Sequence, residues 1–114
     1  MRFQISTHDV QLHPEAVSRF EQHLRNVFHP YASQLSGVTM HLTNCQDSDR
    51  KFACRIQVHR RRSDDVIITD QDERLAVLVK RAVRRASAAV RNRLGRKRAF
   101  RRRRRYIARP LTAV

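Results

Sequence analysis

The residues of this sequence best suited to bind another molecule are cations spaced along one predicted helix. They are Lys80, Arg81, Arg84 and Arg91, with Arg85 beside them. At about 100° per residue, the first four fall within about 100° of arc, opposite an apolar stripe. The guanidinium of arginine is a planar fork that matches phosphate oxygens, so such a row can follow a phosphate backbone. The alternative is an ordinary solvated surface, which normally mixes both signs of charge.

The charge of the chain is concentrated in its C-terminal third. The net charge of the 114 residues is +15. Residues 1–73 contain nine Lys or Arg and ten Asp or Glu, whereas residues 74–114 contain sixteen Lys or Arg and no acid. This asymmetry implies a polyanionic partner, with nucleic acid the first candidate and an acidic membrane surface the second. It also favours binding over solvation for the cation row.

The predicted helix changes character near its end. Arg93 and Lys97 fall at the angle that is apolar up to Val90, so we expect the helix to leave the folded body at about residues 91–94. Gly95 is the residue at which we expect the helix to end or weaken. We therefore predict one folded domain, residues 1–95, and a flexible basic tail, residues 96–114.

The tail has no periodic apolar face and is expected to be disordered without a partner. A basic arm that becomes ordered on RNA is the functional interpretation, and a solvated extension that adds non-specific attraction is the alternative. The predicted RNA-binding cations beyond the row are Arg25, Arg93, Arg96, Lys97 and Arg98, together with the tail residues Arg101, Arg102, Arg103, Arg104 and Arg105.

Other reactive residues do not form a recognisable site. The six histidines include no i,i+4 pair on one helix face, and Cys45 and Cys54 form no CxxC motif. His41 and His59 are expected near each other on an exposed sheet face, where a metal site is a remote alternative. The sequence has no glycine-rich phosphate loop and no nucleophile motif. We expect no enzymatic activity, metal, cofactor or small-molecule substrate.

The N-terminal half predicts a strand, a helix and a hairpin. Residues 2–7 alternate as in a strand, and apolar residues recur at helical spacing over residues 14–29, with Pro14 suited to the first position and Pro30 closing the helix. Residues 37–45 and 51–60 alternate and are joined by a polar loop, which is typical of a hairpin.

A third short strand is expected over residues 65–69, followed by a helix that Asp70 caps with Glu73. The apolar stripe of that helix comprises Leu75, Leu78, Val79, Ala82, Val83, Ala86, Ala89 and Val90. The predicted fold is therefore α+β, in the order β-α-β-β-β-α, with two helices packed on one face of a four-stranded, mainly antiparallel sheet.

The sequence resembles the ribosome hibernation promoting factor and ribosome-associated inhibitor A family, also called sigma-54 modulation proteins, in its short form. The resemblance covers about residues 1–98. It is carried by "MRFQISTHDVQLHPEAVSRFEQHL", by the hairpin "GVTMHLTNCQDSDRKFACRIQVHRR" and by "DQDERLAVLVKRAVRRASAAVRNRL". Two features depart from the family pattern. The start of the second helix usually contains a Tyr, in the pattern "D-x-Y-A-A-I", whereas this chain has Arg74, Leu75 and Ala76 there, and the run Arg101–Arg105 matches no family motif.

The resemblance implies binding to the small ribosomal subunit, in the channel for messenger and transfer RNA, and hence inhibition of translation in idle ribosomes. The expected partners are the 30S subunit, the 70S ribosome and their ribosomal RNA, and the expected state off the ribosome is a monomer. The cation row falls on the helix that carries the family's RNA-contacting cations. The first helix also contributes cations in the family, and its matching stretch here offers only Arg25. The sequence has no signal segment and no apolar stretch long enough to span a bilayer, and its two cysteines do not make a disulfide framework. The chain is therefore expected in the cytoplasm, without a membrane partner.

Three alternatives remain open. A double-stranded-RNA-binding domain, or another RNA-binding protein outside the ribosome, shares the α-β-β-β-α order. However, that domain places lysines at the start of its last helix, where this chain has Asp70, Asp72 and Glu73. A protein held on a membrane surface by its polybasic tail is the second alternative. The third is an enzyme with a basic substrate cleft, for which no catalytic group argues.

Overall fold

The chain forms a mixed four-stranded sheet in the computed structural model, which describes residues 1–45 and 51–93. The strands are β1 (Arg2–His8), β2 (Leu35–Asn44), β3 (Phe52–Arg60) and β4 (Val66–Asp72). They lie side by side in chain order, with β1 parallel to β2 and the other two pairs antiparallel. The predicted hairpin is the β2–β3 pair.

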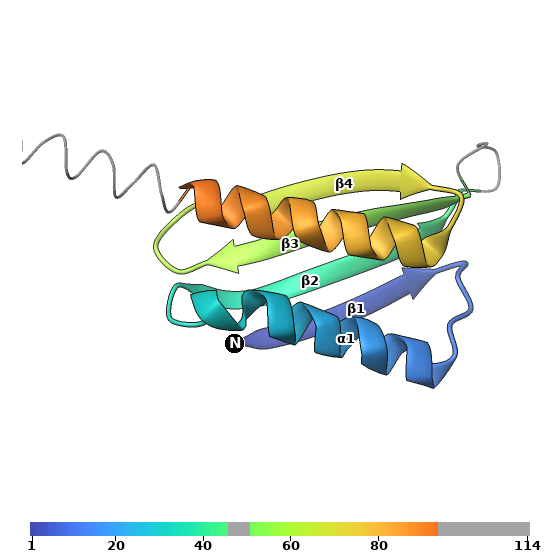
Figure 1. Ribbon diagram of the computed structural model, residues 1–114, viewed down its shortest axis with the longest axis horizontal. Coiled ribbons are helices and arrows are strands. Elements are labelled where there is room, and N and C mark those ends of the chain that lie inside the picture. The colour runs from blue at the N-terminus through green and yellow to red at the C-terminus, as the bar shows by residue number, and fades with distance from the viewer. Residues whose placement is uncertain (46–50, 94–114) are drawn as a thin grey trace, which may run out of the picture.

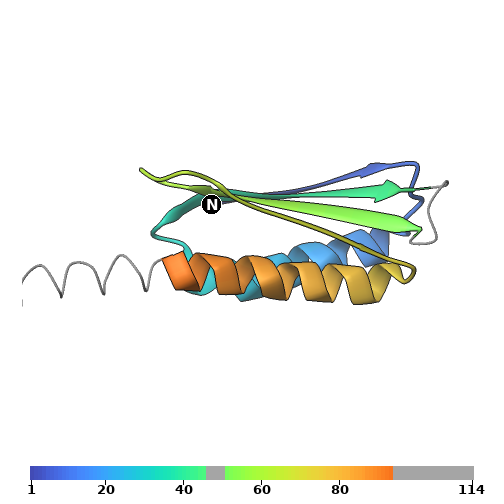
Figure 2. The ribbon, with the colours of Figure 1, turned by 90° about the horizontal axis from the view of Figure 1, so that it is seen from above.

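Two helices cover one face of this sheet (Figures 1 and 2). Helix α1 (Pro14–Phe28) connects β1 to β2, and a short 3-10 turn, η1 (His29–Tyr31), follows it. A second helix follows β4 and spans residues 75–93 of the described chain. The colours of Figure 1 show that both helices run in the same direction. The predicted α+β fold, in the order β-α-β-β-β-α, is confirmed.

The ends of α1 follow from its sequence. Pro14 occupies the first turn, where its missing N–H costs no hydrogen bond, and Nδ1 of His13 accepts a bond from the backbone N–H of Glu15 at 3.3 Å. At the other end the N–H of His29 bonds to the carbonyl of Arg25. Pro30 lies in η1, one residue beyond this bond.

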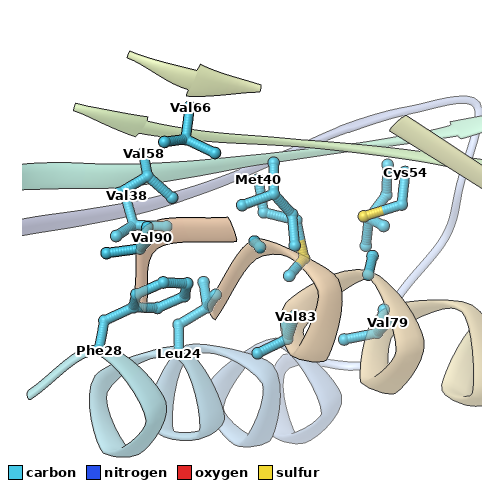
Figure 3. Packing of buried hydrophobic residues seen from close by; sticks show 14 of the residues in the cluster. Leu24, Phe28, Val38, Met40, Cys54, Val58, Val66, Val79, Val83 and Val90 are labelled. Atoms are coloured by element: carbon cyan, nitrogen blue, oxygen red, sulfur yellow. The ribbon is translucent and has the colours of Figure 1, made fainter. Parts of the chain in front are cut away.

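The core lies between the sheet and the helices (Figure 3). Alternate residues of β2 and β3 point into it, as the sequence predicts: Val38, Met40, Leu42, Cys54, Ile56 and Val58 are all buried. From the second helix, Leu78, Val79, Ala82, Val83, Ala86 and Val90 are buried, and Leu75 and Ala89 pack against them. The predicted apolar stripe is therefore confirmed, and it fixes which face of the second helix remains exposed.

The predicted start of the second helix is wrong. Asp70 lies inside β4, where it is the register partner of Cys54, and Asp72 is the last strand residue. The helix begins at residue 75, and Oδ1 of Asp72 accepts a bond from the N–H of Arg74 at 3.0 Å. Pairing with β3 extends the strand over the residues whose side chains resemble a helix cap.

The predicted domain boundary after residue 95 and the predicted tail, residues 96–114, lie outside the described residues. Neither described helix combines the length and the apolar composition that crossing a membrane requires.

Candidate nucleic-acid interface

The structure divides the predicted cation row between two flanks of the second helix. Lys80, Arg84 and Arg91 are exposed and make no ion pair with any residue that the structure describes. Arg81 and Arg85 each follow one of these residues by one position, which rotates them by about 100° towards β4. The two flanks therefore have different partners and different chemistry.

Arg81 is bound to the end of β4. Its Nε lies 2.7 Å from Oδ2 of Asp70, and its Nη1 lies 2.9 Å from Oδ2 of Asp72. Its Nη2 donates to the backbone carbonyl of Gln71 at 2.8 Å. The hydrogen bond from Arg81, with the N–H of Gln71, lowers the pKa of Asp70 from 3.8 to about 2. With its donors occupied, Arg81 connects the helix to the sheet.

Two more arginines on this flank bond to β4 or to the residue before it. Arg85 lies 3.3 Å from Oδ2 of Asp70 and donates to the carbonyl of Thr69 at 3.2 Å. Arg93 donates to the carbonyl of Asp65 at 3.4 Å. These contacts place both residues on the sheet side of the helix, away from the cations of the other flank.

A groove of about 760 Å³ runs between α1 and the second helix. His23 and Val27 line it from α1; Val77, Lys80, Arg81, Val83, Arg84, Ser87, Ala88 and Arg91 line it from the second helix. None of these residues is acidic. All the cations are on the second helix, and the α1 side contributes an imidazole and an isopropyl group. We call Lys80, Arg84 and Arg91 the cationic rim.

Arg25, the remaining predicted site residue on α1, does not reach the groove. Its Nη2 lies 2.8 Å from Oε1 of Glu21, and its guanidinium carbon lies 5.0 Å from the ring centroid of Phe3 on β1. Both contacts hold it on the flank of α1 that faces β1. The structure therefore does not bring Arg25 together with the cationic rim.

The remaining predicted cations, Arg96, Lys97 and Arg98, lie outside the described residues, as do Arg101, Arg102, Arg103, Arg104 and Arg105.

His41 and His59, which the sequence predicts to be neighbours, lie at different register positions of the β2–β3 pair. His41 is the register partner of Arg55, and its Nδ1 lies 2.6 Å from the hydroxyl of Ser6. His59 is paired with Gly37, and its Nδ1 lies 3.0 Å from Oδ2 of Asp65. No group of three metal-ligating side chains occurs in residues 1–45 and 51–93.

Cys54 is a core residue, as its inward register predicts. Burial raises the pKa of its thiol to about 12, and the carboxylate of Asp70 adds to the effect. A thiol that stays protonated is a poor nucleophile and a poor metal ligand.

Sequence reasoning missed the groove residues Val77, Ser87 and Ala88 on the second helix, and on α1 it missed His23 and Val27. The signal was present, because both lie at the border of the apolar stripe of α1, four residues apart. What the sequence does not show is which element lies beside that border.

Comparison with solved structures found similar folds. A ribosomal subunit interface protein from Coxiella burnetii has a TM-score of 0.70 and 12% sequence identity, over 83% of this chain and 99% of that chain. The chain has the fold of this protein. The Thermus thermophilus Protein Y N-terminal domain has a TM-score of 0.66 and 18% identity, over 81% and 98% of the two chains. No family model and no curated protein sequence matches the chain.

Proposed function

We propose that this chain is a ribosome-binding protein that contacts small-subunit ribosomal RNA through the cationic rim and acts without chemistry. The fold shared with a ribosomal subunit interface protein supports the partner. The family resemblance of the sequence points to the same partner. We take the helix surface, rather than a catalytic centre, to be the functional site.

The observation that carries the proposal is that the cationic rim is exposed and unpaired among the described residues. Lys80, Arg84 and Arg91 are exposed, and no described acid neutralises them. Spacings of four and seven residues place them at rises of about 6 and 10 Å along one side of the helix. Three cations in line can contact phosphates along one RNA strand, and a rigid helix makes the contacts without ordering a loop.

The resemblance supports a more specific proposal. The protein would occupy the channel for messenger and transfer RNA in the 30S subunit or the 70S ribosome, and so hold idle ribosomes inactive in the cytoplasm. It would arrive as a monomer, and the basic tail would add attraction to RNA. A double-stranded-RNA-binding domain is a weaker candidate, because β1 pairs with β2 and lies outside that domain's α-β-β-β-α core.

Sedimentation of cell lysate through a sucrose gradient tests the proposal. We expect the wild-type protein in the 30S and 70S fractions at low salt, and the Lys80/Arg84/Arg91→Ala variant near the top of the gradient. The control is Arg2/Lys51/Arg55→Ala, which removes the same charge from exposed positions away from the groove and should still sediment with ribosomes. Absence of the wild type from ribosomal fractions contradicts the proposal, and recovery with lipid vesicles favours a membrane partner.

A further inference from the structure

The groove between the helices differs in chemistry from one side to the other. Its second-helix side carries the cationic rim. Its α1 side carries His23 and Val27 and has no Lys, Arg, Asp or Glu in the lining. The floor between them is formed by apolar and small side chains. In cross-section the groove is therefore charged on one edge and uncharged on the other.

We propose that this groove binds one unpaired nucleotide of an RNA strand, with the base against the floor and the flanking phosphates on the cationic rim. The inference rests on the proposed function, since it names the RNA conformation that the same surface selects. A strand with an unpaired base has the matching cross-section, because its phosphates line one edge and its base projects from the other.

The floor has the character of a base-binding surface. Val27 and Ser87 are partly buried and line the groove between the cationic rim and His23, whereas Val83 in the same lining is fully buried. Ser87 is small, which leaves room for a planar ring between the helices. Covering this apolar surface with a base is favourable, whereas leaving it in water is not. His23 can stack on a base or bond to its edge.

A fully paired duplex uses this groove poorly. In double-stranded RNA the bases are stacked inside, and proteins contact mainly phosphates and 2′-hydroxyls. Such a ligand would engage the cationic rim but would present a hydrated backbone to the apolar floor. An extruded base satisfies both parts of the groove, so an unpaired site should bind more tightly than a paired one.

An acidic amphipathic peptide helix is the other ligand that a cation-bordered apolar groove can take. Such a helix carries acids on both sides of its apolar stripe and is best matched by cations on both edges of a groove. Here the edge formed by α1 offers only His23. The one-sided charge therefore favours RNA.

Two RNA hairpins of the same stem, one fully paired and one with a single bulged adenosine, test the inference with the full-length protein. Fluorescence anisotropy at fixed salt should give a Kd about 5-fold lower for the bulged hairpin, because stacking of one base is worth about 1 kcal/mol or more. Ser87→Leu, which fills the floor, should abolish this preference and leave the Kd for the paired hairpin unchanged. Ser18→Leu, on the exposed far side of α1, is the matched control and should keep the preference.

A second variant makes the result independent of whether Ser87→Leu folds. His23→Ala removes the side chain on the uncharged edge and should reduce the preference without changing binding to the paired stem. Equal affinity of the wild type for the two hairpins would overturn the inference, even if the protein still sediments with ribosomes. Displacement of the bulged RNA by an acidic amphipathic peptide, but not by the paired stem, would also overturn it in favour of a protein ligand. If the protein prefers the bulged hairpin but does not associate with ribosomes, the proposed function is overturned and the inference about the groove stands.

Discussion

Arg81 and Arg84 are three residues apart on one helix and have opposite surroundings. The guanidinium of Arg81 is bonded to two carboxylates and a carbonyl, and its side chain is only a third exposed. Arg84 is exposed on the groove side and has no partner among the residues that the structure describes. The two arginines look equivalent in the sequence but have different roles: Arg81 holds the helix against β4, and Arg84 remains available to a ligand.

Single substitutions of these two arginines should have opposite effects. Arg81→Ala leaves the carboxylates of Asp70 and Asp72 with fewer partners and should lower the free energy of unfolding. Arg84→Ala should change it by no more than about 0.5 kcal/mol but should weaken binding to ribosomes. Urea unfolding and gradient sedimentation of both variants check this. Equal stability of the two variants would contradict the division.

The carboxyl of Asp70 should make stability depend on pH in the acid range. Its bonds to Arg81 and to the N–H of Gln71 lower its pKa in the folded state to about 2, from an ordinary value of 3.8. Because the folded pKa is the lower one, the contribution is fully present above about pH 4 and is lost as the pH falls towards 2.

Thermal unfolding of Asp70→Asn measures this contribution. The variant should be less stable than the wild type at pH 7, and the difference should shrink between pH 4 and pH 2. Asp64→Asn is the control, because Asp64 is exposed and has no ion pair in the described chain. A difference that stayed constant with pH would show that the carboxylate of Asp70 is not stabilised by folding.

At the scale of the elements, the sequence predicts the helices and strands whose apolar residues recur with a regular period. The apolar stripe of the second helix spans four turns, and the alternation in β2 and β3 places three pairs of residues in the core, so both appear in the burial as expected. The helix start was missed because Asp70 and Asp72 suit both a cap and a strand end. Pairing with β3 decided between them, and a local pattern does not contain that information.

The candidate site was predictable only in part, for the same reason. The sequence places five cations on one side of the second helix. Their division depends on β4 lying beside one flank and α1 beside the other, which is a property of the sheet order. Arg25 was assigned to the site only because the family resemblance implies cations on the first helix, but its contacts with Glu21 and Phe3 turn it the other way.

Close packing of β1 on β2 depends on Gly37. A Cβ at this position would lie 2.8 Å from the carbonyl oxygen of Arg2, closer than atoms of the two strands can approach. Gly37→Ala should therefore move β1 and lower the free energy of unfolding by about 1–3 kcal/mol. Ser36→Ala, at the exposed neighbouring position, should have a much smaller effect. Chemical denaturation of the two variants gives the comparison, and equal effects would mean that β1 adjusts without strain.

At the scale of the whole molecule, most of the folded body carries little net charge, and the positive charge that can attract RNA lies in the C-terminal third of the chain. The body up to residue 73 is nearly neutral, and the excess positive charge begins with the second helix. Only part of that charge is on the described surface and free to bind, since Arg81, Arg85 and Arg93 are bonded to β4 or the residue before it. Net charge therefore overstates the number of phosphate contacts that the folded body can make.

The salt dependence of RNA binding should reflect that smaller number. Each neutralised phosphate contributes about 0.7–0.9 to the slope of log Kd against log salt concentration. Removing the cationic rim with Lys80/Arg84/Arg91→Ala should thus lower the slope by about 2–3. The charge-matched Arg2/Lys51/Arg55→Ala variant should leave it nearly unchanged. An equal loss of slope in both variants would indicate attraction by net charge alone.

The bonds from arginine to the β4 side of the sheet have a consequence for how the protein behaves when it is abundant. β4 is an edge strand, and an edge strand offers its free carbonyls to any extended chain that approaches. The carbonyls of Asp65, Thr69 and Gln71 instead accept bonds from Arg93, Arg85 and Arg81. An incoming strand would have to displace these side chains first. The arginines that fasten the helix thereby also discourage the copies of this protein from polymerising edge to edge.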